Sequence, residues 1–303
     1  MKKLVIATRR SRLALWQSEH VAASLQRLHP GMGVELLPLS TRGDELLDRR
    51  LDQAGGKGLF VKELENAMVE GRADLAVHSI KDVPADMPPG FALAAITARE
   101  DPRDVFISNN HRSLSEMPKG ASLGTSSLRR SAQIVERFPH LEIRLLRGNV
   151  DTRLAKLERG EYDAIVLAMA GLKRLGLERK ATARLEPEEM LPAPGQGALG
   201  IECLAARADV MRVLAPLADG ATSACVRAER AVSRALGGSC TLPLAAYGEM
   251  VSGALRLRAL VASADGKRVV RCDLQGAAAD PEALGKRAAD DLRRQGAAEI
   301  LGI

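Results

Sequence analysis

The sequence predicts an α/β protein with two doubly wound sheets, followed by a small α+β domain at the C-terminal end. Short apolar runs, typical of buried strands, alternate with amphipathic stretches along most of the 303 residues. This pattern restarts after a charged connector near residue 100, and a second connector rich in Pro and Gly lies near residue 195. Toward the end of the chain, strands of alternating polarity indicate an antiparallel sheet.

The first domain is predicted to be discontinuous, over residues 1–97 and 198–216. Its strands are expected at residues 4–7, 34–39, 74–77, 91–96 and 199–202. The inner face of its first helix is expected to carry Leu13, Val21, Leu25 and Leu28. Because the last strand follows the second connector, it is predicted to return to the first sheet, as in two-lobed proteins that close over a ligand.

The second domain is predicted over residues 101–193 and the third over residues 219–303. Strands of the second domain are expected at residues 105–107, 122–124, 143–146 and 164–168, with a helix that runs to Phe138. The third domain is expected to contain a helix at 221–236, strands at 255–259 and 269–274, and a closing helix at 281–295.

The charge balance raises the possibility of an acidic partner. Lys and Arg outnumber Asp and Glu by 44 to 38, which gives a net charge of +6 and a pI near 9.3. Only 2% of the residues are aromatic, and the arginines are dispersed over loop positions, which argues against nucleic acid as the partner. A small ligand with several carboxylates or phosphates suits that dispersal better.

No stretch of the sequence approaches a membrane span. The apolar run at residues 4–7 is interrupted by Arg9 and Arg10, and it is shorter than the ~7–15 residues of a secretory signal. We therefore expect a cytoplasmic protein with no membrane partner. The polar stretch at residues 41–52 has no clear periodicity and is predicted to be a mobile loop or lid.

The four cysteines show no paired spacing typical of a zinc site, so no metal is expected, and we expect thiols rather than disulfides. Cys203 in a strand and Cys225 on a helix are predicted to be core residues. Cys240 differs because it lies on a glycine-flanked loop after a helix, where a thiol is accessible. Its position alone leaves open whether Cys240 has a functional role, as a nucleophile or attachment point, or none.

A cluster of polar residues follows the strand at 74–77. His78, Lys81 and Asp82 lie within five residues of each other, and Pro84 ends the regular structure. Ligands of doubly wound sheets bind beyond the carboxyl ends of the strands, so these side chains are candidates to face a substrate. The alternative is a solvated turn, and the decision depends on whether other strand ends carry similar groups.

Other strand ends do carry cationic and hydroxyl groups. The arginines at these junctions are Arg9, Arg129, Arg130, Arg147, Arg153 and Arg174. Guanidinium groups pair bidentately with carboxylates, each charged hydrogen bond contributing ~1.5–3 kcal/mol, so a polycarboxylate or oligophosphate ligand is predicted. Ser11 is either a helix cap or a ligand-binding group. The cluster around Lys57 lacks the spacing of a nucleotide-binding phosphate loop, although Lys57 can still reach an anion.

Seven segments, taken in order, resemble one known family, the porphobilinogen deaminases or hydroxymethylbilane synthases. They are residues 7–17 (ATRRSRLALWQ), 55–63 (GGKGLFVKE), 78–84 (HSIKDVP), 124–130 (GTSSLRR), 146–153 (LRGNVDTR), 194–202 (PGQGALGIE) and 229–243, which ends in GGSCTLP. The resemblance covers essentially the whole chain.

This resemblance implies a fold, a reaction and a cofactor. The fold has three domains, the first two like type II periplasmic binding proteins. The reaction condenses four porphobilinogen molecules into the linear tetrapyrrole hydroxymethylbilane and releases ammonia. The cofactor is a dipyrromethane made from substrate and held by a thioether to Cys240. Loss of ammonia from an aminomethylpyrrole leaves an electron-poor azafulvene, which a thiolate or a pyrrole carbon can attack.

The resemblance also implies roles for individual residues. Asp82 matches the catalytic aspartate, which accepts pyrrole N–H groups, stabilises positive charge and shuttles protons. The implied cofactor-binding residues are Cys240, Ser79, Lys81, Thr125, Ser127, Arg129, Arg130, Arg147, Gly148 and Arg153. The implied substrate-binding residues are Arg9, Ser11, Gln17, Arg147, Arg153 and Arg174.

Further implications of the resemblance concern the loop at residues 44–50, expected to be a lid over the cleft, and the oligomeric state, expected to be a monomer. A rival from another class stays open at this point, namely a non-catalytic anion-binding module, because two-lobed folds also serve as receptors.

Overall fold

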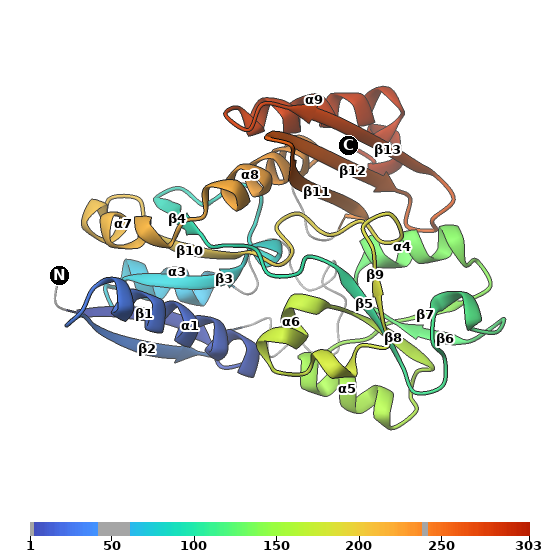
Figure 1. Cartoon of the computed structure of the whole chain (residues 1–303), viewed down its shortest axis with the longest axis horizontal. Coiled ribbons are helices and arrows are strands. Elements are labelled where there is room, and N and C mark those ends of the chain that lie inside the picture. Colours follow the sequence, from blue (N-terminus) through green and yellow to red (C-terminus); the bar gives the residue numbers. More distant parts are fainter. Residues whose placement is uncertain (1–2, 42–60, 238–241) are drawn as a thin grey trace. The chain divides into compact units, whose positions relative to one another are not determined.

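The computed structural model describes residues 3–41, 61–237 and 242–303, and it separates into two compact units (Figure 1). The first unit contains residues 1–100 and 198–223, and the second contains residues 101–197 and 224–303. The predicted lid at 44–50, Lys57 and Cys240 lie outside the described residues.

The first unit is built on a five-stranded sheet of order β2-β1-β3-β10-β4. These strands are β1 (Lys3–Arg9), β2 (Gly33–Leu39), β3 (Leu75–Ser79), β4 (Phe91–Ile96) and β10 (Leu199–Leu204). β1 pairs parallel with β2 and β3, whereas β10 runs antiparallel between β3 and β4. The strand expected to return from the second connector therefore completes this sheet.

Both faces of the first sheet are covered by apolar side chains, which is why its strands read as near-continuous hydrophobic runs. The helices of this unit are α1 (Arg12–Leu28), α3 (Lys62–Val69), α7 (Ala208–Leu214) and the start of α8 (Gly220–Ala235). α1 buries Val21 and Leu25 as predicted, but Leu28 is 46% exposed, so its place in the inner stripe was wrong. Leu28 is the last residue of the helix, where the buried stripe ends.

The second unit holds another five-stranded sheet, of order β7-β6-β8-β5-β9. Its strands are β5 (Asp104–Ser108), β6 (Ser122–Gly124), β7 (Glu142–Arg144), β8 (Ala164–Ala168) and β9 (Ala183–Leu185). Its helices are α4 (Leu128–Arg137), α5 (Val150–Glu158) and α6 (Met169–Arg174). Separate buried clusters cover its two faces, so this sheet is also doubly wound.

The remainder of the second unit is a three-stranded antiparallel sheet of β11 (Leu244–Val251), β12 (Ala254–Ala262) and β13 (Val269–Gly276). Helices α8, α9 (Pro281–Arg294) and α10 (Ala297–Leu301) contribute to the core on one of its faces. Ala132 of α4 joins a smaller cluster with Leu260 on the other face. The fold is thus α/β with two doubly wound sheets and a small α+β part, as predicted.

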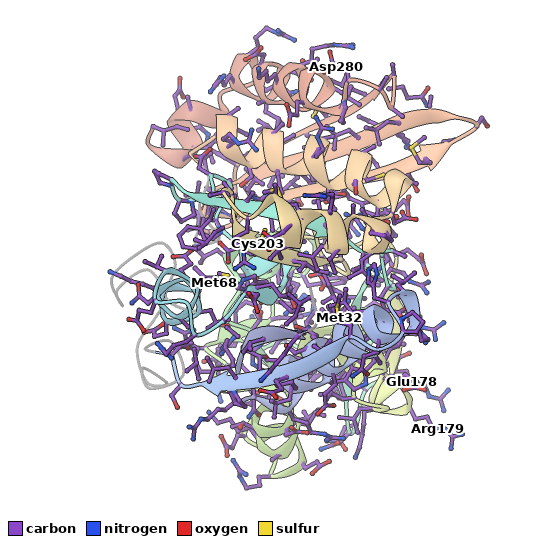
Figure 2. The ribbon with its side chains drawn as sticks, turned by 90° about the vertical axis from the view of Figure 1, so that its left-hand side faces the viewer. Met32, Met68, Glu178, Arg179, Cys203 and Asp280 are labelled. Carbon is purple, nitrogen blue, oxygen red and sulfur yellow. The ribbon has the colours of Figure 1, made fainter. Side chains whose placement is uncertain are left out.

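Single-turn 3₁₀ helices connect several elements: η1 (Ile80–Asp82), η2 (Leu114–Glu116), η3 (Glu178–Lys180) and η4 (Ala215–Leu217). Cys203 is fully buried in β10 (Figure 2), and Cys225 and Cys272 are buried as well. Among the described residues, no helix is long and apolar enough to cross a membrane.

Candidate active site

The turn that carries Asp82 is held tightly by its own backbone and by one buried side chain. Ile80 donates its N–H to the Ala198 carbonyl at 3.1 Å, and the Val83 N–H returns to the Ile80 carbonyl at 3.0 Å. The Ile80 side chain is 1% exposed and packs over Gly200 of β10, where an added Cβ would come within 2.3 Å of Ile80 Cδ1. Asp82 itself is exposed, so a fixed turn presents its carboxylate to solvent.

Two further predicted residues meet beside this turn. The buried Gln17 of α1 donates from Nε2 to the Ser79 hydroxyl at the end of β3, at 2.9 Å. The bond joins a helix to the strand that leads into the turn, so Gln17 positions Ser79. Lys81 follows within the turn and is half-buried.

A buried acid–base pair lies directly before the turn, so the expectation that His78 faces a substrate was wrong: His78 is 7% exposed and pairs with Glu202. His78 Nε2 lies 2.8 Å from Glu202 Oε2 of β10, with both residues buried. Burial and the nearby Glu202 carboxylate raise the pKa of Glu65 on α3. In the pairing of β3 with β10, His78 lies opposite Gly200. The contact between His78 and Glu202 therefore joins these two strands just before the turn that carries Asp82.

The end of β1 carries Arg9 and Ser11. Ser11 is the N-cap of α1, and its hydroxyl accepts a hydrogen bond from the Ala14 N–H at 3.3 Å. The capping role of Ser11 is therefore present, while a ligand-binding role remains a prediction. Because β1 and β3 are parallel neighbours, Arg9 belongs to the same sheet edge as Ser79 and the turn.

In the second unit, predicted hydroxyl groups line the start of α4. Thr125 is 3% exposed, and its hydroxyl accepts from the Ser127 N–H at 3.2 Å. Ser127 is the N-cap, and its hydroxyl accepts from the Arg130 N–H at 3.4 Å. Both oxygens thus stabilise the first turn of α4, which carries the two arginines.

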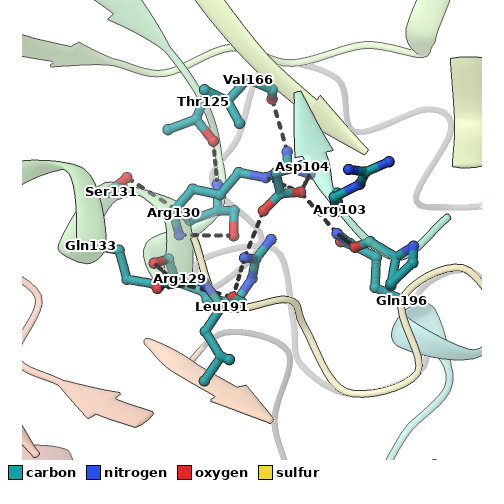
Figure 3. A network of polar contacts seen from close by, with 12 residues as sticks. Arg103, Asp104, Thr125, Arg129, Arg130, Ser131, Gln133, Val166, Leu191 and Gln196 are labelled. Atoms are coloured by element: carbon teal, nitrogen blue, oxygen red, sulfur yellow. Dashed lines mark hydrogen bonds and ion pairs between the residues drawn. The ribbon is translucent and has the colours of Figure 1, made fainter. Parts of the chain in front are cut away.

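Arg129 and Arg130 converge on a single buried carboxylate, that of Asp104 at the start of β5 (Figure 3). Arg129 Nη1 donates to Asp104 Oδ2 at 2.7 Å and to the Leu191 carbonyl at 2.7 Å. Arg130 Nη2 donates to Asp104 Oδ1 at 2.8 Å, and its Nη1 to the Val166 carbonyl at 2.9 Å. Gln196 Nε2 adds a third partner, 2.9 Å from Asp104 Oδ1.

This cluster has more positive than negative charge. Burial alone would raise the pKa of Asp104, but the two guanidiniums outweigh it and hold that pKa below its usual range. One carboxylate then faces two guanidiniums. Arg129 Nε is buried and has no acceptor among the residues that the structure describes. A surplus cation with an unused donor suits an anionic ligand group.

A second anion-suited turn follows β7. Gly148 has a φ of 113°, a left-handed conformation that favours glycine, and a Cβ there would come within 2.7 Å of Thr152 Cγ2. Arg153 Nε donates to the Gly148 carbonyl at 2.8 Å, and Lys156 Nζ lies 3.4 Å from the Arg147 carbonyl. Arg147 and Arg153 therefore lie at the two sides of the turn that leads into α5, and Arg153 is bonded to the turn backbone.

Two other features of the second unit bear on the predicted site. Arg174, at the end of α6, is 8% exposed and donates from Nη2 to the Gly197 carbonyl at 2.7 Å. Asn149 caps α5 by accepting from the Thr152 N–H at 2.8 Å. Sequence inspection missed Asn149 as a cap, although Asn before an amphipathic stretch is a usual signal.

The structure thus groups the predicted residues into two sets. Arg9, Ser11, Gln17, Ser79, Lys81 and Asp82 belong to the first unit, and Thr125, Ser127, Arg129, Arg130, Arg147, Gly148, Arg153 and Arg174 belong to the second. Within the described ranges, no group of three or more His, Cys, Asp or Glu side chains is arranged to hold a metal ion.

Comparison with solved structures includes several distant matches. The methionine binding protein MetQ is 12% identical with a TM-score of 0.48, over 71% of this chain and 89% of that one. A domain of BvgS from Bordetella pertussis is 14% identical with a TM-score of 0.43, over 71% of this chain and 85% of that one. Similarity at this level adds nothing to what the strand pairing shows.

Comparison with protein families and curated proteins is far more specific. Residues 4–212 match the family model "Porphobilinogen deaminase, dipyromethane cofactor binding domain", and residues 223–294 match the model of the C-terminal domain of the same family. A protein of Bordetella parapertussis named porphobilinogen deaminase is 59% identical over 99% of this chain and 96% of its own length. One of the same name from Paraburkholderia phytofirmans is 58% identical over 98% of this chain and 88% of its own. On this evidence the chain belongs to the porphobilinogen deaminase family.

Proposed function

We propose that this protein is a porphobilinogen deaminase. It condenses four porphobilinogen molecules head to tail into hydroxymethylbilane, releases ammonia at each addition, and builds the chain on a dipyrromethane attached through Cys240. The observation that carries the proposal is the exposed carboxylate of Asp82 on a fixed turn, within the segment that matches the cofactor-binding domain of the family.

The residues of the second unit suit a dipyrromethane cofactor, because pyrroles derived from porphobilinogen carry acetate and propionate groups. The buried Arg129 Nε lacks an acceptor among the described residues, and the cluster around Asp104 has a surplus positive charge. Arg129, Arg130, Arg147 and Arg153, with Thr125 and Ser127, would hold these carboxylates. When bound, the cofactor supplies a pyrrole carbon to which the first substrate is joined.

Asp82 is the catalytic group in this proposal. Its carboxylate accepts a pyrrole N–H, and its negative charge stabilises the positive charge that develops on the ring as ammonia leaves. It then takes up the proton released when aromaticity is restored. The buried Ile80 and the bond from Gln17 to Ser79 keep the turn rigid, so the carboxylate requires little reorganisation during the reaction.

Substrate carboxylates are proposed to bind Arg9, Ser11, Gln17, Arg147, Arg153 and Arg174. Part of this set is already engaged: Gln17 donates to Ser79, and Arg174 donates to the Gly197 carbonyl. We propose that these two residues act mainly through orientation, Gln17 by placing Ser79 and Arg174 by placing the Gly197 backbone. Arg147 and Arg153 lie on either side of the Gly148 turn, and Arg153 donates to its backbone carbonyl.

The test is turnover together with the mass of the intact chain. Purified protein made with porphobilinogen available should exceed its sequence mass by a two-ring addition that maps to Cys240. Asp82→Asn should keep the addition and lower kcat by ~10²–10⁴-fold, the usual contribution of general acid–base assistance. Asp86→Asn is the matched control, since Asp86 is another exposed aspartate just after the turn, and it should retain kcat.

Two results would contradict the proposal. An unmodified chain would remove the cofactor, and near-normal turnover of Asp82→Asn would remove Asp82 from its catalytic role. Binding of porphobilinogen without any release of ammonia would instead support the rival, a non-catalytic anion-binding module. We further propose a cytoplasmic monomer with no nucleic-acid or membrane partner, which light scattering and salt-dependent binding assays would check.

A further inference from the structure

Asp104 is a fully buried carboxylate that neither its sequence context nor the family resemblance singled out. Its two oxygens accept hydrogen bonds from three side chains: Oδ2 from Arg129, and Oδ1 from Arg130 and Gln196 (Figure 3). Asp104 is 0% exposed, so no ligand reaches it past these partners. Each oxygen thus fixes one guanidinium, and the carboxylate as a whole sets the spacing of the pair.

We propose that Asp104 is a positioning residue, which holds Arg129 and Arg130 in the arrangement that receives a carboxylate of the dipyrromethane cofactor. The inference rests on the proposed function and deepens it. Backbone carbonyls complete the arrangement, since Leu191 accepts from Arg129 and Val166 from Arg130. After these bonds, Arg129 Nε still has no acceptor among the described residues, and it is the donor left for a ligand.

The geometry explains why an uncharged residue of the same shape cannot replace Asp104. An Asn side chain has one acceptor oxygen and one NH₂ donor. Its oxygen can accept from Arg130 and Gln196, or from Arg129, but not from both sides. The NH₂ group would then face a guanidinium, donor against donor. Removing the carboxylate would also leave two buried cations without an anion, so both side chains would move to relieve the repulsion.

Gln196 offers a milder way to disturb the same carboxylate. Its Nε2 donates to Asp104 Oδ1 at 2.9 Å and to the Pro102 carbonyl at 2.6 Å, and the residue is 1% exposed. Gln196→Met keeps a similar volume and removes a neutral donor without stranding a charge. It therefore loosens Asp104 with less risk to the fold than Asp104→Asn.

The experiment follows cofactor attachment in the full chain, independently of turnover. Chains purified without porphobilinogen are incubated with it, and the rate of the two-ring mass gain is measured by intact mass spectrometry. Asp104→Asn should slow attachment at least about tenfold, because charged hydrogen bonds to both arginines are lost. Gln196→Met should slow it less, about two- to tenfold, because only a neutral donor is removed and both arginines keep their bonds to Asp104.

The matched control is Asp163→Asn. Asp163 is another aspartate of the same sheet region, and it accepts from the Ser122 N–H and hydroxyl, both at 2.7 Å, with no arginine among these partners. Its loss should lower the melting temperature but leave the attachment rate within about twofold of wild type. The gain in melting temperature on cofactor attachment is a second readout. This gain should shrink in Asp104→Asn. If the aspartate were merely structural, its loss would lower the melting temperatures of the chain with and without the cofactor equally.

The outcomes separate the inference from the function on which it rests. A wild-type chain that gains no mass would contradict the proposed function. If the wild type gains mass and Asp104→Asn gains it as fast or faster, with an undiminished rise in melting temperature, Asp104 has no positioning role. Should Asp104→Asn fail to fold, Gln196→Met decides, and attachment at the wild-type rate in that variant overturns the inference.

Discussion

Substitution of Gly200 tests whether the buried Ile80 side chain sets the position of Asp82. In Gly200→Ala the new methyl group would lie 2.3 Å from Ile80 Cδ1 and 3.0 Å from Leu93 Cδ2, well inside contact distance. Ile80 is 1% exposed, so its side chain has little room to rotate away, and we expect the contact to shift its turn. Overpacking of this kind lowers the free energy of unfolding by about 1–3 kcal/mol. The shifted carboxylate should reduce kcat by about 10–10²-fold.

The decisive variant is the double substitution with Ile80→Val, which deletes the Cδ1 atom that the new methyl group would strike. Ile80→Val alone should cost about 0.5–1.5 kcal/mol of unfolding free energy. In the double variant the closest remaining contact is the 3.0 Å to Leu93 Cδ2, so the two costs should not add. We expect a favourable coupling of at least about 1 kcal/mol, above the ~0.3–0.5 kcal/mol scatter of independent sites.

Urea unfolding followed by circular dichroism gives the free energies, and ammonia release gives kcat. Gly220→Ala is the matched control, because beyond its own helix no atom of the described residues lies within 4 Å of the added Cβ, and its φ is not left-handed. It should leave both quantities near wild type. Strict additivity in the unfolding free energies, or a double variant as slow as Gly200→Ala, would refute the argument that Ile80 transmits the strain to Asp82.

The pH dependence of stability and the reactivity of the thiols give two further predictions. The pKa of Asp104 is lowered in the folded protein by Arg129 and Arg130, so its contribution is complete above the unfolded carboxyl pKa of about 3.9 and is lost as pH falls below it. Between about pH 5 and pH 2, the free energy of unfolding measured with urea should fall more steeply for wild type than for Asp104→Asn; parallel curves would argue against the pairing. Burial raises the pKa of Cys272 to about 11, and Cys203 and Cys225 are also buried. Iodoacetamide at mildly alkaline pH should therefore label none of these three thiols before unfolding, as peptide mapping can check, and rapid labelling of any one of them would contradict its burial.

Sequence reasoning succeeded where a strand is apolar throughout and failed where an element is short or weakly patterned. The bounds of β4, β6 and β8 agree with the predicted ranges, since continuous apolar runs mark strands buried on both faces. β11 was missed because its Ala, Gly and Glu residues give little strand propensity. The three-residue β9 and the single-turn η1 are too short for any periodicity to show.

The candidate site shows the same division between local and long-range signals. The arginines at strand ends were found because each lies at a recognisable strand-to-helix junction. Asp104 was not, because its partners lie 25 and 26 positions away in the sequence, and only the fold brings them together. The burial of Arg129 and Arg130, which are 4% and 6% exposed, could not be predicted for the same reason. Adjacent arginines at a helix start are usually solvated, and only the distant Asp104 accounts for their burial.

The place of β10 has a consequence for synthesis on the ribosome. β3 and β4 are made early, yet neither pairs with the other, and the strand that joins them is Leu199–Leu204. The first sheet therefore stays open until the roughly one hundred residues between β4 and β10 have emerged, roughly five to twenty seconds at usual elongation rates. The second sheet is complete once β9 has been made, because it contains no later strand. It can therefore form while the first sheet still lacks β10. The order of maturation along the chain then reverses the order of translation.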